Sequence, residues 1–343
     1  MEKEKCKICD RDSNAFHYGV CDFFKFSAKH VLQANCCNAC KMFFRRVITF
    51  KTPLKACSLK EECFDGATKN FGCRLCRFQK CVTAGMIHNQ ETITLSTTLV
   101  LLSQMEFDKR DTLENRQSFK EITFEEATDV APVKFILKSS GQVFDCSDWE
   151  RMHQITIIDY LKRHNISRML TAADLKAFLK GSYVYSAILS LAMHDYSLKS
   201  GFIKFPEGVD VLPKEMSVIL AAKSELEIGI KCRLIGRLAE LQVTNEEFLF
   251  LSMIFVCNPA VAGISKSGAI LLSSYQQLYS NLLFKYCQTT HQNLAPTRFT
   301  DLLSLSHVVA KTKQDIASAV LLLKFYKPDF GFRKFSKAQL NVC

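Results

Sequence analysis

Cysteine pairs separated by two residues recur through the first quarter of this chain. They are Cys6–Cys9, Cys37–Cys40 and Cys73–Cys76, and Cys57 and Cys63 form a looser pair. A two-residue gap lets both thiolates of one tight turn reach the same ion, and tetrahedral zinc takes four such ligands at about 2.3 Å. Eight cysteines therefore predict two closed, all-sulfur zinc sites. A closed site has no open coordination position for a reacting water, so both sites are expected to be structural.

The compartment expected for this chain favours metal binding over disulfides. Eleven of the sixteen cysteines lie in residues 1–86, and the first residues contain no apolar run of the kind that marks a secretory signal. The longest apolar stretch, from Phe248 to Ile264, is interrupted by a proline and is shorter than a membrane span. We expect a soluble, intracellular protein, in which cysteines stay reduced and clustered ones bind metal.

Positive charge is concentrated in the same segment. The chain carries a net charge of +11, and residues 1–86 hold 16 Lys and Arg against 8 Asp and Glu. Such local basicity suggests a polyanionic partner, although a merely solvated basic surface explains it equally well.

Three cysteines of this segment are left over. Cys36 gives a three-residue gap to Cys40, the poorer match to a metal pair. Cys81 falls on a helical stripe with Leu75 and Phe78, so we interpret it as a small packing residue. Cys21 is interpreted as a free thiol, with a spare ligand as the alternative.

The residues that follow Cys40 predict an amphipathic helix, because apolar and cationic side chains separate at about 100° per residue. A zinc site fixes the start of this helix, and its apolar face packs into a small core, which leaves a rigid basic face exposed. Such a face fits the DNA major groove, where Lys or Arg reaches guanine while other cations hold phosphates. The apolar face comprises Phe43, Phe44, Val47 and Ile48, and the opposite face comprises Lys41, Met42, Arg45 and Arg46.

A second helix is predicted from Arg74 to Ala84, with Gly85 as its C-terminal stop. Its cations, Arg74, Arg77 and Lys80, add capacity for phosphate binding, and its apolar stripe is expected to cross the first helix.

Together these motifs resemble the DNA-binding domain of the nuclear hormone receptors, and in particular the nematode supplementary receptors. The resemblance rests on the strings CKICD, HYGV, CCNACKMFFRRV and CRLCRFQKCVTAGM. It implies a double zinc module with one zinc held by each set of four cysteines, and double-stranded DNA as the partner. The implied zinc ligands are Cys6, Cys9, Cys37 and Cys40, then Cys57, Cys63, Cys73 and Cys76. The implied DNA contacts are Asn38, Ala39, Lys41 and Arg45 near the bases, and Tyr18, Arg46, Arg77 and Lys80 at phosphates.

This chain departs from the family in two places. Asn38-Ala39 replaces the residue pairs of better-known receptors, so their half-site preference does not transfer. Twenty-seven residues separate Cys9 from Cys37, about fourteen more than in the family, and we place the insertion at about 21–35. Loop entropy alone makes this insertion cost about 0.6 kcal/mol, far less than zinc binding contributes. The sequence leaves open whether the insertion is tolerated, regulatory or a translated unspliced segment.

The rest of the chain is expected to contain a hinge or linker over 87–131 and an all-α domain over 132–343. Few Gly and Pro interrupt its apolar helical pattern, which predicts a three-layer helical core. The double zinc module takes residues 1–86. Helices are expected over 149–164, 171–197, 213–241, 245–256, 267–288 and 298–325, the fourth beginning with a capping box at Thr244 and Glu247.

This second domain resembles the ligand-binding domain of the same family, through ISRMLTAADLKAFLK, EEFLFLSMIFVCNPAVAGIS and PTRFTDLLSL. The resemblance implies homo- or heterodimerisation, coregulator proteins and a small lipophilic ligand, and the sequence leaves open whether this chain has one. The basic tail from Lys327 to Cys343 contains no glutamate. The acidic half of the family's charge clamp for coactivator peptides is therefore missing, while Lys162 supplies the basic half. We expect weak or absent ligand-dependent activation through that groove.

The leading functional hypothesis is a nuclear, sequence-specific transcription factor of the nuclear-receptor type. A receptor isoform with impaired DNA binding, acting through its helical domain, is the alternative that the insertion raises. A zinc-dependent protein-interaction module fits less well, because His17 and His30 lack the spacing of LIM or RING ligands. Enzyme activity is not expected, because HExxH, P-loop, GxGxxG and GxSxG motifs are all absent from the sequence.

Overall fold

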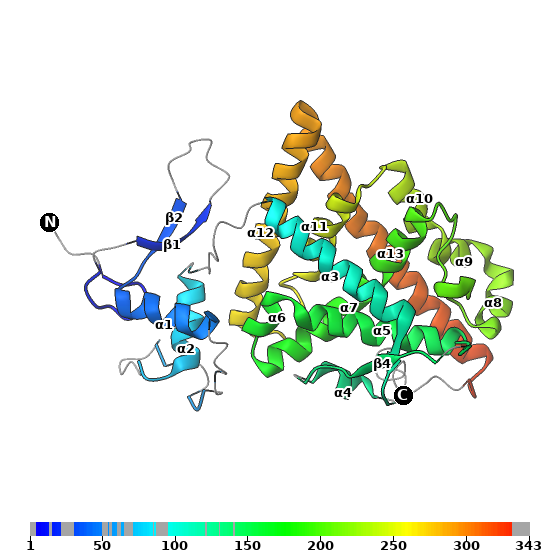
Figure 1. The fold of residues 1–343 in the computed structure, drawn as a ribbon, viewed down its shortest axis with the longest axis horizontal. Coiled ribbons are helices and arrows are strands. Elements are labelled where there is room, and N and C mark those ends of the chain that lie inside the picture. The colour runs from blue at the N-terminus through cyan, green and yellow to red at the C-terminus, as the bar shows by residue number, and fades with distance from the viewer. Residues whose placement is uncertain are drawn as a thin grey trace.

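The computed structural model describes residues 5–13, 16–21, 31–49, 54, 57–59, 63–64, 71–84, 86, 95–120, 122–129, 131–139 and 141–330. Figure 1 shows a small N-terminal unit beside a larger helical body. The small unit contains strands β1 (Phe16–Cys21) and β2 (Val31–Asn35) and helices α1 (Asn38–Thr49) and α2 (Arg74–Thr83).

The inserted segment contributes to a β-hairpin. β1 and β2 pair antiparallel, with Phe16 opposite Asn35 and Cys21 opposite Val31. Residues 31–35, which we placed within the insertion, thus form the second strand of a two-stranded sheet. Residues 22–30 lie outside the described part of the chain.

The apolar stripes of α1 and α2 meet in the core of the small unit. Phe44 of α1 and Phe78 of α2 stack with ring centroids 5.6 Å apart, and both are buried. Cys81 is fully buried in the same core, as its position on the stripe predicts.

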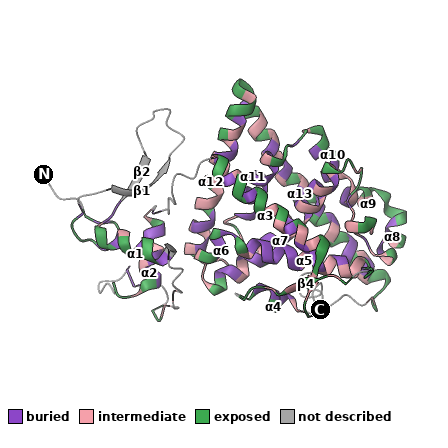
Figure 2. Cartoon of the chain, viewed as in Figure 1, coloured by how far each residue is buried: buried purple, intermediate pink, exposed green. Residues whose placement is uncertain are grey.

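The helical body is built around α7 (Ala172–Ser197), which contacts helices on both of its sides (Figure 1). Figure 2 shows buried residues gathered along α5, α7 and α11 at the centre of this body. The other elements, in chain order, are α3 (Leu95–Asn115), β3 (Arg116–Ser118), α4 (Phe124–Thr128), β4 (Phe135–Leu137), α5 (Cys146–Arg163), α6 (Asn165–Met169), α8 (Lys214–Leu220), α9 (Ser224–Lys231), α10 (Arg233–Glu240), α11 (Asn245–Val256), α12 (Lys266–His291) and α13 (Ala295–Tyr326).

Two expectations about the helices need correction. Residues 95–115 were expected within a linker, but they form α3, which packs on α5 and buries Leu102. The helix expected over 213–241 is divided into α8, α9 and α10. It breaks at Lys223, whose backbone angles leave the helical region, and again at Cys232. The first break follows from the exposed run Ala221–Lys223, which has no large apolar residue to hold it against the body.

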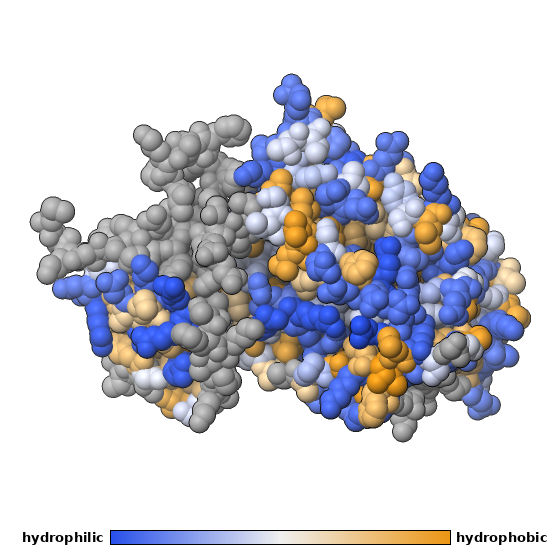
Figure 3. Space-filling view, viewed as in Figure 1, coloured by the Kyte–Doolittle hydropathy of each residue, from blue (hydrophilic) through white to orange (hydrophobic). Residues whose placement is uncertain are grey.

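The capping box of α11 is present as predicted. The Thr244 hydroxyl accepts from the Glu247 N–H, and the Glu247 carboxylate accepts from the Thr244 N–H. Hydrophilic side chains cover most of the visible face of the body in Figure 3, with apolar residues in small separate groups. None of the described helices is long and apolar enough to span a membrane.

A buried ion pair joins α11 to α13. Glu247 is fully buried, and its carboxylate accepts hydrogen bonds from Arg298, whose Nε lies 2.7 Å away. Arg298 also donates to the Leu241 carbonyl at 2.6 Å. Removing one partner of such a pair leaves an uncompensated buried charge.

Substitution Glu247→Gln should therefore lower the free energy of unfolding by about 3 kcal/mol. The change is measured by urea unfolding, followed through the fluorescence of Trp149, the single tryptophan, which is fully buried. The control is Glu240→Gln, which removes an exposed pair with Arg237 and should change stability by less than about 1 kcal/mol. Equal effects of the two substitutions would contradict a structural role for the buried pair.

Candidate metal centres and nucleic-acid interface

Four sulfurs from two distant segments converge at the base of α1. The ligand atoms of Cys6, Cys9, Cys37 and Cys40 all lie within 4.8 Å of one another, and Cys9 Sγ is 3.5 Å from Cys37 Sγ. A zinc tetrahedron with 2.3 Å bonds has sulfurs about 3.8 Å apart. Cys6 and Cys9 belong to a tight turn, tied to the end of β2 by a hydrogen bond from the Lys7 N–H to the Asn35 carbonyl at 3.0 Å.

A second cluster of four sulfurs lies at the start of α2. The Sγ atoms of its four cysteines also lie within 4.8 Å of one another. The Sγ–Sγ distances from Cys57 are 3.4 Å to Cys63 and 3.5 Å to Cys76. A disulfide requires about 2.05 Å, so these spacings fit sulfurs that share an ion. The cluster comprises Cys57, Cys63, Cys73 and Cys76.

The chemistry of both donor sets fits zinc. Burial raises the pKa of the Cys40 thiol, and the guanidinium of Arg77 opposes that shift. Burial likewise raises the pKa of the Cys76 thiol, as do its neighbouring cysteines. A bound zinc ion holds such sulfurs as thiolates and supplies cross-links between segments that are distant in sequence. The protein therefore has two zinc sites of four cysteines each, and the eight predicted cysteines are the ones that the fold brings together.

Of the three cysteines left over, Cys36 and Cys81 are described with their side chains, and both lie outside the two clusters. Cys36 is fully buried, and burial raises the pKa of its thiol to about 11. Its neighbour Cys37 is the one whose sulfur faces the first cluster. Cys21 ends β1, and its side chain is outside the described part of the structure.

Helix α1 presents a cationic face. Phe44 and Val47 are buried beneath it, whereas Lys41 on the other side is half-buried. Asn38 and Ala39 are exposed at the first turn, between Cys37, which directly precedes the helix, and Cys40 within it. Two further exposed side chains on this face are Arg45 and Arg46. The first turn and the cationic face of α1 thus form one continuous solvent-exposed surface.

Arg77 has a role that its position in the sequence does not reveal. Its Nη2 donates to Cys40 Sγ at 3.3 Å, and its guanidinium lies 4.6 Å from the centre of the Phe43 ring. Arg77 therefore ties α2 to the first zinc site and to α1. No local pattern signals this contact, because 37 positions separate the partners.

The remaining expected DNA contacts are placed only in part. Lys80 is half-buried on α2. Tyr18 lies in β1, and its side chain is outside the described part of the structure.

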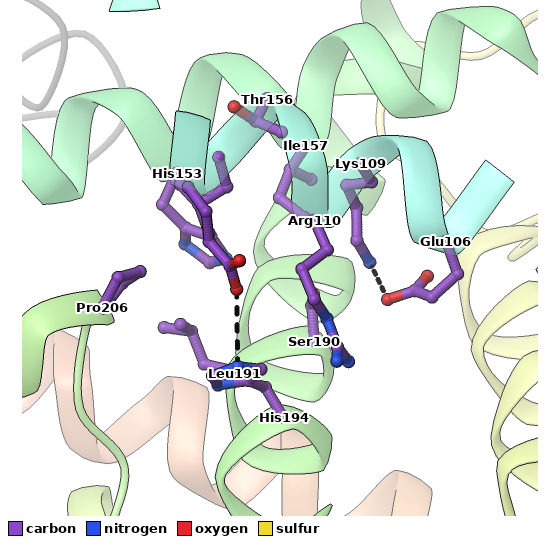
Figure 4. Close-up of a pocket in the computed structure, with 12 residues that line it drawn as sticks. Glu106, Lys109, Arg110, His153, Thr156, Ile157, Ser190, Leu191, His194 and Pro206 are labelled. Atoms are coloured by element: carbon purple, nitrogen blue, oxygen red, sulfur yellow. Dashed lines mark ion pairs between the residues drawn. The ribbon is translucent and has the colours of Figure 1, made fainter. Parts of the chain in front are cut away.

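The helical body contains a small pocket between α3, α5 and α7, lined by both apolar and charged side chains. Figure 4 shows His153, Lys109 and Glu106 among the side chains that line it, with Lys109 paired to Glu106. The cavity measures about 30 Å³, room for one or two water molecules rather than a lipophilic molecule. Burial lowers the pKa of His153 to about 3, and the Lys109 charge adds to this effect, so the imidazole is neutral.

Comparisons with known proteins agree with this division of the chain. Residues 4–88 match the family described as double treble clef zinc finger, C4 type. Residues 141–326 match the family described as ligand-binding domain of nuclear hormone receptor.

Full-length relatives are also found. The chain is 36% identical over 327 residues to nuclear hormone receptor family member nhr-27 of Caenorhabditis elegans, covering 94% of this chain and 88% of that receptor. It is 32% identical to member nhr-9 of the same organism, over 99% of this chain and 97% of that receptor. Member nhr-167 is 31% identical, over 99% and 98% of the two chains.

The zinc content of cysteine variants distinguishes zinc ligands from cysteines that bind no metal. The full chain should contain two zinc ions, the substitution Cys57→Ser should reduce this to one, and Cys36→Ser should leave it at two. The metal is counted by plasma mass spectrometry after gel filtration. Loss of zinc from Cys36→Ser comparable to that from Cys57→Ser would refute the assignment of the two clusters.

Proposed function

The chain belongs to the nuclear hormone receptor family, and from this premise we propose that it reads a DNA half-site in the nucleus with the first turn of α1. Membership makes it a DNA-binding transcription factor of the nuclear-receptor type, and not an enzyme. The proposal adds which residues contact DNA and where.

The observation that carries this proposal is the exposed polar and cationic surface of α1. Asn38, Ala39 and Lys41 lie at the turn that the first zinc site anchors, and Arg45 follows one turn later. A helix held rigidly at its first turn presents base-reading side chains in a fixed geometry. Lys41 and Arg45 are proposed to contact bases, and Asn38 and Ala39 to allow close approach.

Phosphate contacts are proposed for Arg46 at the exposed face of α1 and for Lys80 on α2. Arg77 is proposed to act on DNA mainly by holding the two helices together, since its guanidinium already bonds Cys40. Tyr18 is proposed as a further phosphate contact from β1.

The helical domain is proposed to mediate dimerisation through the C-terminal half of α13. Leu321, Phe325 and Tyr326 expose large apolar surfaces there, at 65%, 78% and 60% of their full areas. Such residues gathered on one helix end are typical of an association surface. The basic tail that follows, whose lack of a glutamate predicts weak coactivator recruitment, lies outside the described residues from 331 onward.

Base and phosphate contacts should differ in their response to salt. The affinity of the full chain for its selected duplex should fall with a log–log slope near −5, for about six phosphate contacts. Lys41→Ala should cost about 1–3 kcal/mol on that duplex and relax its sequence preference, whereas Arg46→Ala should weaken all duplexes alike and reduce the slope by about 1.

Both substitutions are measured by fluorescence anisotropy over a salt series, with Lys223→Ala on the helical domain as the control. An unchanged sequence preference in Lys41→Ala would overturn the assigned base contact.

The hairpin insertion should be dispensable for DNA binding. Replacing residues 22–30 with Asn-Gly joins Cys21 to Val31 by a two-residue turn that suits their antiparallel pairing. The shortened protein should retain two zinc ions and bind the same duplex within about threefold, because loop closure changes by less than about 1 kcal/mol. A gain in affinity of more than tenfold would instead show that the insertion hinders DNA approach.

A further inference from the structure

The hairpin of β3 and β4 is a two-stranded sheet whose register fixes its hydrogen bonds. Gln117 lies opposite Ile136, and two positions further along β3 the Phe119 N–H donates to the Lys134 carbonyl at 3.0 Å. In an antiparallel ladder, residue pairs that exchange hydrogen bonds alternate with pairs that do not. Lys134 and Ile136 therefore direct their backbone groups toward β3, and the residues on either side of Ile136 direct theirs away from it.

The outward backbone groups belong to Phe135 and Leu137, on a strand that Figure 1 shows at the lower edge of the helical body. Within the described part of the chain, their N–H and C=O groups make no hydrogen bond beyond the hairpin. The opposite edge of the hairpin is covered, because the Ser118 N–H of β3 lies 3.4 Å from the Sδ of Met152 on α5. The open edge of this hairpin is thus β4.

The helical body holds β4 at both of its ends. Phe135 is half-buried and packs against a cluster that includes Phe144 and Trp149. The Lys138 ammonium lies over the same two rings, 3.7 Å from the centre of Trp149 and 4.5 Å from the centre of Phe144. An edge that is fixed before binding loses little conformational freedom when a further strand pairs with it.

Apolar side chains are exposed beside this edge. Ile136 and Leu137 of β4 are 41% and 70% exposed, and Phe119, directly after β3, is 66% exposed. Successive side chains of a strand point to opposite faces, so Ile136 lies on one face of the hairpin and Leu137 on the other. A strand added to β4 therefore has apolar surface to cover on both faces.

The charge at the edge favours one kind of occupant. Lys134 is exposed and forms no ion pair with any of the described residues. If two copies of β4 paired antiparallel, with Phe135 of each opposite Leu137 of the other, Lys134 of one copy would lie opposite Lys138 of the other. Like charges directly opposite destabilise a strand pair, and a lysine on an edge discourages self-association. The edge therefore favours an acidic partner over a second copy of this chain.

This edge is separate from the groove beside Lys162. β3 meets α5 at Met152, and Lys162 is ten residues further along that helix, a distance of about 15 Å. The edge belongs to the helical domain, so it does not depend on the DNA contacts proposed for α1.

We propose that β4 is a docking edge for an extended segment of a partner protein, which adds to the hairpin as a third strand. The partner segment pairs its backbone with the outward groups of Phe135 and Leu137. It carries an acidic residue that reaches Lys134 and apolar residues that cover Ile136 and Leu137. Main-chain hydrogen bonds give such a site its affinity, and the side chains give it its specificity.

The charge preference of the edge is tested with two fluorescein-labelled synthetic peptides. One alternates glutamate and valine, and the other has lysine in place of glutamate. Binding to the chain of 343 residues is followed by fluorescence anisotropy at physiological salt, which screens distant charges. The wild type should bind the glutamate peptide at least about tenfold more tightly than the lysine peptide. Lys134→Glu should reduce this preference at least about tenfold, whereas the control Lys223→Glu should change it less than about twofold.

A proline tests whether the peptide pairs with the backbone. Leu137→Pro removes one outward N–H and keeps the bonds between Ile136 and β3, because proline lacks only its own N–H. It should weaken binding of the glutamate peptide at least about fivefold more than Leu137→Ala does, since alanine keeps the N–H. The fluorescence of Trp149 reports whether each variant is folded, and Lys134→Glu decides the outcome if the proline variant unfolds.

Absence of binding by the wild type at millimolar peptide, an unchanged charge preference in Lys134→Glu, or equal binding by folded Leu137→Pro and Leu137→Ala overturns the proposal. Dimerisation of the wild type that Leu137→Pro abolishes, seen by gel filtration, also overturns it, because a second copy of the chain would then be the occupant of the edge.

Discussion

The N-terminal unit depends on zinc–thiolate bonds that join segments far apart in the chain. Cys6 and Cys9 come from one turn, and Cys37 and Cys40 from the start of α1, with twenty-seven residues between Cys9 and Cys37. A unit of this size buries too little apolar surface to fix its helices by packing alone. The metal supplies that constraint, and the stack of Phe44 on Phe78 then sets how α2 crosses α1. The exposed side chains of α1, which we propose as the DNA contacts, are consequently held in a fixed geometry.

The two domains are connected by a non-covalent contact as well as by the polypeptide chain. Gln79 of α2 donates to Ser267 at the start of α12, at 3.0 Å. α2 also bears Arg77, which bonds a zinc ligand, so the same short helix touches both the metal centre and the helical domain. In the helical domain, the buried pair of Glu247 and Arg298 joins α11 to α13 in a comparable way.

Much of this arrangement was predictable from the sequence because its signals are local. The zinc ligands follow from cysteine spacing, and the helices α1, α2, α7 and α11 follow from the period of their apolar residues. The ends of α2, α7 and α11 agree within one position, whereas α1 begins three residues earlier than expected. Helix α3 was missed because few of its residues are buried, so its apolar pattern is weak. The contacts of Arg77 with Cys40 and of Lys162 with Ala127 and Ala131 join residues more than thirty positions apart. Such contacts depend on the tertiary fold and produce no periodic pattern in the sequence.

The central claim is that the metal centres create the DNA-reading surface. It is tested most directly by titrating zinc into the metal-free, reduced chain of 343 residues while its binding to a selected duplex is followed by fluorescence anisotropy. We expect no specific binding without metal, and full specific affinity once two zinc ions per chain are bound. Metal-free protein that binds the same duplex with the same affinity and specificity would contradict this account.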